Sequence, residues 1–173
     1  MVDVPSADAS VDPSVRIASL RYYDPQGAFA AAILLLGLTL PKPLRCVVAR
    51  SAAGSIDILA WRSPTETVWI CDSAPRFDVL RRAIPATDEG CLIDQTHGRR
   101  LIRLHGTAAR SLAHLGSGFA EIGVGAVRIG RMADITVLAC RPRAEELLLI
   151  IDRLYLEHFI GYLKTVTPWE KNT

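Results

Sequence analysis

The four histidines are the residues of this chain that most often bind metals or move protons. His97, His105, His114 and His158 are separated by eight, nine and 44 positions. A helical zinc site needs two histidines four positions apart, so this spacing does not indicate one. His97 is expected in a turn and His105 at a strand end, where either ring could titrate near neutral pH, but a single histidine is more often structural. The sequence therefore predicts no metal site.

The four cysteines are also far from one another. Cys46, Cys71, Cys91 and Cys140 are spaced 25, 20 and 49 positions apart, and all four lie in apolar segments of the strand type. This pattern is typical of reduced thiols in the core of a cytoplasmic protein rather than of a disulfide framework. We therefore expect core thiols and a cytoplasmic location.

Three further patterns could support catalysis or cofactor binding. The glycine-rich segment 116–125 follows an expected helix, whereas a dinucleotide fingerprint follows a strand, and Glu121 replaces its third glycine. Ser117 lies between two glycines, but the sequence places no general base beside it. The carboxylate pairs at 88–89 and 145–146 are sequence neighbours in loops, so they point apart. We predict no catalytic and no cofactor-binding residue in this chain.

Aromatic and arginine residues beside expected loops form the remaining candidate site. These residue types are enriched where proteins bind one another. The interface candidates are Arg21, Tyr22, Tyr23, Trp61 and Trp169, and Trp69 belongs to the same group. The alternative is that these side chains pack in the core or at its rim. Trp169 is the least suited to a core position, because it follows the last expected helix in a polar segment.

Helices and strands alternate along the chain and must position these residues. Apolar spacing and capping residues predict helices over 25–36, from Ser73 through Ile84, from Gly106 to Leu115, and after Asp152. The expected strands cover 46–50, 56–62, 67–71, 91–94, 100–105, 127–129, 135–141 and 147–151. Hairpins as well as crossovers connect them. This order predicts a single α+β domain, with a mainly antiparallel sheet and helices packed on one face.

The domain is expected to cover residues 15–167. Residues 1–14 contain three Asp and no Lys or Arg, so they indicate a flexible tail rather than a signal peptide. Residues 168–173 form a second tail. The longest apolar run, 28–40, has 13 residues, fewer than the roughly 20 that span a bilayer. We expect a buried helix there and no membrane partner.

The composition excludes several classes of protein. The 173 residues include 20 Lys plus Arg and 18 Asp plus Glu, which gives a net charge of +2, and 50% are hydrophobic. These values exclude a disordered chain, a collagen-like repeat and a disulfide-rich miniprotein. The balanced charge argues against nucleic acid as the main partner, because nucleic-acid-binding domains usually carry a strong basic excess.

Several segments together resemble a known superfamily. Residues 94–110, DQTHGRRLIRLHGTAAR, are similar to the strand, turn, strand and helix segment of folate-binding aminomethyltransferase-like domains. Residues 61–69, WRSPTETVW, are similar to a Pro-x-Glu-Trp strand of the same superfamily. The segments that resemble the γ subunit of heterotetrameric sarcosine oxidase are 128–131, 134–141 and 150–158. We therefore expect an aminomethyltransferase-like fold.

This resemblance implies an accessory γ subunit of a four-subunit flavoenzyme that oxidises sarcosine or a related N-methyl amino acid. Its partners are α, β and δ subunits, and FAD, FMN, NAD and tetrahydrofolate belong to those partners. The family supplies no catalytic residue for this chain. Residues 120–123 and the position of Trp69 depart from its pattern, so a sister complex such as an N-methylglutamate dehydrogenase stays open. A free-standing folate-binding or aminomethyltransferase-like protein is the alternative, and a structural adaptor outside one-carbon metabolism is a third.

Overall fold

The computed structural model describes residues 9–84, 86–106, 119 and 122–166, and these contain two antiparallel sheets of five strands each. In spatial order, sheet A contains β1 (Ala9–Val11), β7 (Arg99–His105), β10 (Glu146–Asp152), β9 (Ile135–Arg143) and β8 (Val127–Met132). Sheet B contains β3 (Cys46–Arg50), β4 (Ile56–Ser63), β5 (Glu66–Cys71), β2 (Arg16–Tyr22) and β6 (Gly90–Asp94). The helices are α1 (Ala28–Leu35), α2 (Ala74–Ala83), the 3-10 helix η2 (Arg153–Tyr155) and α4 (Leu156–Val166).

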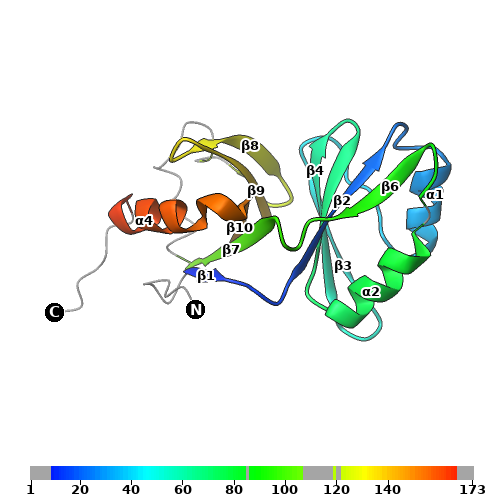
Figure 1. Ribbon diagram of the computed structural model, residues 1–173, viewed down its shortest axis with the longest axis horizontal. Coiled ribbons are helices and arrows are strands. Elements are labelled where there is room, and N and C mark those ends of the chain that lie inside the picture. Colours follow the sequence, from blue (N-terminus) through cyan, green and yellow to red (C-terminus); the bar gives the residue numbers. More distant parts are fainter. Residues whose placement is uncertain (1–8, 85, 107–118, 120–121, 167–173) are drawn as a thin grey trace.

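The sheets and helices form four layers. Figure 1 shows α4 beside sheet A and places α1 and α2 on the far side of sheet B. Side chains such as Ile70 and Leu148 fill an apolar core between the two sheets. A second core packs Phe159 of α4 against sheet A, and a third packs Phe77 of α2 against sheet B. Each sheet is therefore covered on both faces.

Strand β10 shows how the sequence produces this arrangement. Leu148 and Ile150 face the core between the sheets, whereas Leu147, Leu149 and Ile151 face the core beneath α4. Alternate residues of a strand point to opposite faces. A strand buried on both faces must therefore be apolar at every position, which confirms the buried strand expected at 147–151.

The predicted elements are confirmed with small changes at their ends wherever they fall on described residues. Helix α1 begins at Ala28 rather than at position 25. The Ser73 hydroxyl accepts a hydrogen bond from the Arg76 amide at the start of α2, and the Asp152 carboxylate caps η2 in the same way. The helix expected after Gly106 lies outside the described residues over 107–118. The α+β class is confirmed, and the strands divide between two sheets, each with helices on one face.

The first two strands correct the prediction for the N-terminus. The sequence predicts a tail over 1–14, but β1 pairs with β7, with Ala9 opposite Leu104. Strand β2 was not predicted, and it lies between β5 and β6 in sheet B. Strand β1 satisfies backbone groups that the edge of β7 would otherwise leave unpaired. Residues 1–8 and 167–173 lie outside the described part of the chain.

Helix α1 is less buried than the apolar run 28–40 predicts. Phe29 and Ile33 are buried against sheet B, but Leu34 is 59% exposed and Leu35 is 89% exposed. Only one face of a helix at the outer surface can contact the sheet. The contact is close, because a Cβ at Gly90 would lie 2.5 Å from Cγ of Phe29. None of the helices in the described segments is long and apolar enough to cross a membrane.

The core between the sheets gives a direct test of this fold. Leu148 is fully buried there, whereas Leu154 in η2 is 87% exposed. We expect Leu148→Ala to lower the free energy of unfolding by about 2–5 kcal/mol, and Leu154→Ala to change it by less than about 0.5 kcal/mol. Urea denaturation of the two variants measures both values. Equal losses would contradict the packing of the two sheets described above.

Candidate functional site

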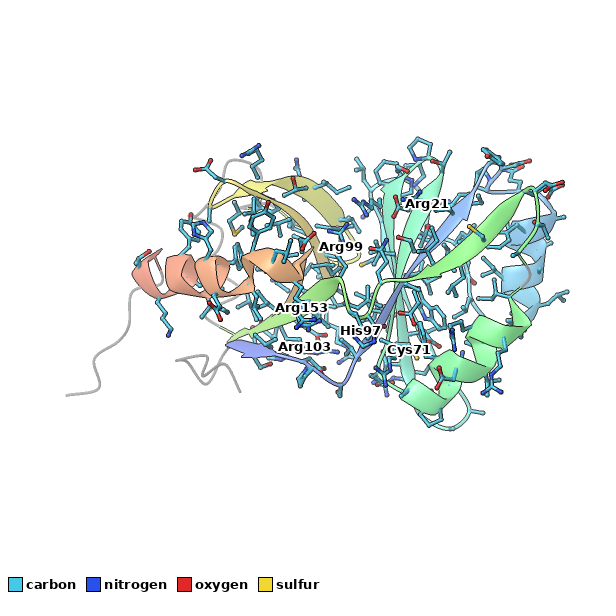
Figure 2. All side chains as sticks on the ribbon, viewed as in Figure 1. Arg21, Cys71, His97, Arg99, Arg103 and Arg153 are labelled. Atoms are coloured by element: carbon cyan, nitrogen blue, oxygen red, sulfur yellow. The ribbon has the colours of Figure 1, made fainter. Side chains whose placement is uncertain are left out.

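The end of β2 separates the first three interface candidates. Tyr22 is buried, its ring packs beside Phe29 with the ring centroids 6.5 Å apart, and its hydroxyl lies 2.8 Å from the Thr67 hydroxyl. Burial raises the pKa of Tyr22. Tyr23 is 81% exposed and Arg21 is also exposed, and Arg21 lies on the sheet B half of the molecule (Figure 2). Core packing therefore accounts for Tyr22, whereas Arg21 and Tyr23 present their side chains to solvent.

The tryptophans occupy different environments. Trp69 is fully buried, its ring stacks on Phe77 with the centroids 4.9 Å apart, and its Nε1 donates a hydrogen bond to Asp57 at 3.0 Å. Core packing therefore accounts for Trp69. Trp61 is half-buried on β4, and Trp169 lies outside the described residues.

Arg21 and Tyr23 border a groove of about 330 Å³ next to the start of α1. Thr65, Glu89 and Cys91 also line it. The Tyr23 amide donates to the Glu89 carbonyl at 3.1 Å, and the Glu89 carboxylate accepts a hydrogen bond from the Ala28 amide at 3.0 Å. Glu89 therefore links the end of β2 to the first turn of α1, and the shape of the groove depends on both elements.

Helix α1 supplies two exposed residues that are not among the interface candidates predicted from the sequence. Leu34 and Leu35 lie in its last turn with most of their side chains in solvent. We refer to Arg21, Tyr23, Leu34 and Leu35 as the α1 surface. The sequence does contain the signal, because a helix that is apolar on every side must either be buried or be covered by another molecule.

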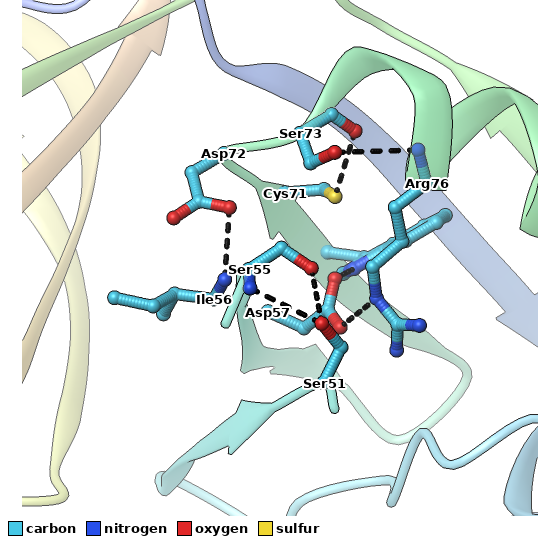
Figure 3. A network of polar contacts seen from close by, with 9 residues as sticks. Ser51, Ser55, Ile56, Asp57, Cys71, Asp72, Ser73 and Arg76 are labelled. Carbon is cyan, nitrogen blue, oxygen red and sulfur yellow. Dashed lines mark hydrogen bonds and ion pairs between the residues drawn. The ribbon is translucent and has the colours of Figure 1, made fainter. Parts of the chain in front are cut away.

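The Asp57 carboxylate is a buried charge whose environment could suggest catalysis. It accepts a hydrogen bond from Trp69 and forms an ion pair with Arg76, whose Nε lies 2.6 Å from Oδ2. Figure 3 shows this carboxylate between its own strand and α2. Both carboxylate oxygens are engaged, so Asp57 holds α2 against sheet B and is not available as a general base.

Cys71 belongs to the same region and is not a nucleophile. Burial raises its pKa to about 12, and its thiol donates to the Ser73 carbonyl at 3.3 Å. A thiol with this pKa is protonated at neutral pH, whereas the reactive form is the thiolate. Cys46 and Cys140 are also buried, and all four cysteines are free. The expectation of core thiols is confirmed for these three, and Cys91 is partly exposed.

The described histidines do not come together. His97 lies in the turn before β7 and His105 ends β7, and both are exposed. Nε2 of His158 on α4 lies 3.0 Å from the Ala133 carbonyl oxygen, and His114 is outside the described residues. Over 9–84, 86–106, 119 and 122–166, no three His, Cys, Asp or Glu side chains are grouped to hold a metal ion.

An ion-pair network holds the N-terminal segment on sheet A. Arg103 donates to Asp12 from Nε at 3.1 Å and to Glu146 from Nη1 at 2.7 Å. The Ser14 hydroxyl and amide donate to the other oxygen of Asp12. Burial raises the pKa of Asp12, but the hydrogen bonds from Ser14 and Arg103 outweigh it and hold this pKa below its ordinary value.

The lowered pKa of Asp12 predicts how stability depends on pH. The carboxylate contributes stability above its unfolded pKa of about 4, and this contribution is lost as pH falls through the lower folded pKa. We expect Asp12→Asn to cost about 1 kcal/mol at pH 7 and less at pH 3, as measured by urea denaturation. Asp88→Asn is the control, because Asp88 is exposed. An Asp12→Asn effect that is equal at both pH values would contradict this prediction.

Comparisons with known proteins establish the fold. No family model matches the sequence. The chain is similar to heterotetrameric sarcosine oxidase from Corynebacterium sp. U-96, solved in complex with pyrrole 2-carboxylate, with a TM-score of 0.73 and 22% identity over 91% of this chain and 82% of that chain. It is also similar to aminomethyltransferase T of the glycine cleavage system from Bartonella henselae, with a TM-score of 0.63 and 16% identity over 91% of this chain. The match covers 45% of the aminomethyltransferase, so this chain spans less than half of its length.

Proposed function

We propose that this chain is the accessory γ subunit of a cytoplasmic, heterotetrameric oxidoreductase of the sarcosine oxidase type. The fold likeness to a chain of such an enzyme supports the proposal, and 82% coverage means that the matched chain is only slightly longer than this one. In this proposal α, β and δ subunits are the partners. They hold FAD, FMN, NAD and tetrahydrofolate and oxidise sarcosine or a related N-methyl amino acid, and this chain contributes contact surface.

The α1 surface is the observation that carries this proposal. Leu35 is 89% exposed and Leu34 is 59% exposed on a helix without a polar face. Full burial of one leucine stabilises a complex by about 1.5–3 kcal/mol relative to exposure. Arg21 and Tyr23 add residue types that contribute much of the binding energy at interfaces. These four side chains, two beside the start of α1 and two in its last turn, are suited to contact a partner subunit.

The buried polar groups also support a structural role. Asp57 fixes α2 to sheet B through Arg76, and Arg103 holds Asp12 and Glu146 on sheet A. Each of these charges has a partner within the chain and acts in packing. The chemical work in this proposal therefore belongs to the other subunits.

A charge placed on the α1 surface tests the proposal. We expect Leu35→Glu to leave the thermal unfolding of the isolated chain unchanged, because the side chain is exposed. In co-expression with the proteins of the neighbouring open reading frames, the same change should weaken assembly about tenfold or more, because a charge must be desolvated at the contact. Co-purification and sedimentation velocity measure the fraction assembled.

Val79→Glu is the matched control. Val79 is 62% exposed, but it lies on α2 rather than on the α1 surface. We expect this variant to assemble as the unmodified chain does. Equal effects of the two substitutions would show that the α1 surface is not the contact. A chain that stays monomeric beside neighbours that include no flavoprotein would contradict the proposal as a whole.

The second candidate is a free-standing folate-binding or aminomethyltransferase-like protein. The similarity to aminomethyltransferase T, at a TM-score of 0.63, favours it. Against it, the groove beside α1 has about 330 Å³, at the small end of the range of about 300–1,000 Å³ for ligand sites. Calorimetric titration of the isolated chain with tetrahydrofolate separates the two. Saturable heat favours this candidate, whereas its absence favours the accessory subunit.

A further inference from the structure

A small cleft opens where the two sheets meet, and it is separate from the groove beside α1. Its walls come from both sheets, and they include Ile17, Arg62, Val68, Arg99, Ile129 and Ile150. The cleft has a volume of about 50 Å³. Since one water-sized group needs about 10–15 Å³, the cleft accepts about four such groups. This excludes a ring system and leaves room for a short, branched group.

The inner faces of the two sheets change from apolar to polar at this cleft. Along β4, Ile58 and Ala60 belong to the core between the sheets, and Arg62 follows two positions later and lines the cleft. Along β7, Arg99 lines the cleft two positions before Leu101, which belongs to the same core. Alternate residues of a strand share a face. The two arginines therefore enter the cleft from opposite sheets, and Figure 2 shows Arg99 near the junction of the sheets.

The carboxylates near the two arginines are already engaged. Oε1 of Glu66 accepts from Arg62 Nη1 at 3.0 Å and from the Ser19 hydroxyl. The Asp152 carboxylate accepts from the Leu154 amide and caps η2. Glu66 thus pairs with Nη1 of Arg62, and Asp152 caps a helix.

Arg99 is left with an incomplete set of partners. Its Nε donates to the side-chain oxygen of Gln95 at 3.1 Å, and no carboxylate of the described residues forms an ion pair with it. Burial lowers the pKa of Arg99, the charge of Arg62 lowers it further, and Asp152 and Glu66 act in the opposite direction. Arginine stays charged at neutral pH, so the cleft contains a half-buried cation that an additional anion would stabilise.

We propose that this cleft binds a short carboxylate through Arg99, assisted by Arg62, and that an aspartate or glutamate side chain of a partner subunit supplies it. The source of the carboxylate rests on the proposed function. A guanidinium pairs with a carboxylate through two parallel hydrogen bonds, and the Ile129 and Ile150 side chains pack against the carbon atoms behind it. The volume of the cleft matches the end of an acidic side chain, for which acetate is a close mimic.

Acetate titration of the isolated chain tests the binding site itself. The Nε–Hε signal of Arg62 and the side-chain amide signals of Gln95 report on the cleft by NMR in every variant, with sodium chloride added to equal ionic strength as the reference. We expect a saturable shift in the unmodified chain and roughly tenfold or more weaker binding in Arg99→Gln. The acetate affinity of Arg99→Lys should lie between these two, because lysine keeps the positive charge but cannot form the two parallel hydrogen bonds of a guanidinium.

Arg128→Gln is the matched control, since Arg128 is exposed on β8 and does not line the cleft. It should bind acetate as the unmodified chain does. Shifts that do not saturate, or that have the same affinity in Arg99→Gln, would overturn the site. Thermal unfolding of each variant shows that its fold is retained.

Co-expression with the neighbouring proteins tests the source of the carboxylate. We expect Arg99→Gln, but not Arg128→Gln, to weaken assembly by about tenfold or more. If acetate binds but Arg99→Gln assembles normally, a free carboxylate is the ligand and the partner source is wrong. If acetate binds and even the unmodified chain does not assemble, the proposed function fails while the carboxylate site stands. If the chain assembles and acetate does not bind, the site fails while the proposed function stands.

Discussion

The apolar contact between the inner faces of the two sheets is the interaction on which the rest of this structure depends. Side chains from β4 and β5 on one sheet and from β9 and β10 on the other form this core. Each sheet then has one outer face left to cover. Helix α4 covers one, and α1 with α2 covers the other. The groove beside α1 includes residues at the end of β2, and the cleft between the two sheets is lined by Arg62 near the end of β4 and Arg99 at the start of β7.

The residues that stabilise the fold differ from those that are available to bind another molecule. The charges in the interior, Asp57 and Glu146, are paired with arginines and hold neighbouring elements together. In contrast, Leu35 of α1 is exposed to solvent. Arg99, in the cleft between the two sheets, has no ion-pair partner among residues 9–84, 86–106, 119 and 122–166. An exposed apolar side chain and a half-buried cation both gain from contact with another molecule. The exposed leucine supports the proposed role as an accessory subunit, and the cation at Arg99 is a second place where a partner could bind.

Local patterns predicted most of the strands, because Gly, Pro and capping residues interrupt the apolar runs at the correct places. The division into two sheets was not predictable in this way, since it depends on pairings between distant strands, such as β2 with β5 and β1 with β7. Residue types suggested interface aromatics, but they could not separate Tyr23 from Tyr22, or Trp61 from Trp69. Neighbouring residues along the chain at the end of β2 point to opposite faces, so Tyr22 is buried and Tyr23 is exposed. Trp69 is buried because its ring stacks on Phe77 of α2. The sequence includes Arg99 only within residues 94–110, which resemble a known superfamily. Its place in a cleft could not be predicted, because residues of sheet B that are distant in sequence supply the opposite wall.

The native mass of the tagged chain, purified without denaturant from its own cells, tests the central claim most directly. We expect one particle that contains several different polypeptides, including this 18.9 kDa chain, and that shows the visible absorbance of a bound flavin. A tagged chain recovered by itself, as a colourless monomer, would contradict the claim that it serves as a subunit of a flavoenzyme.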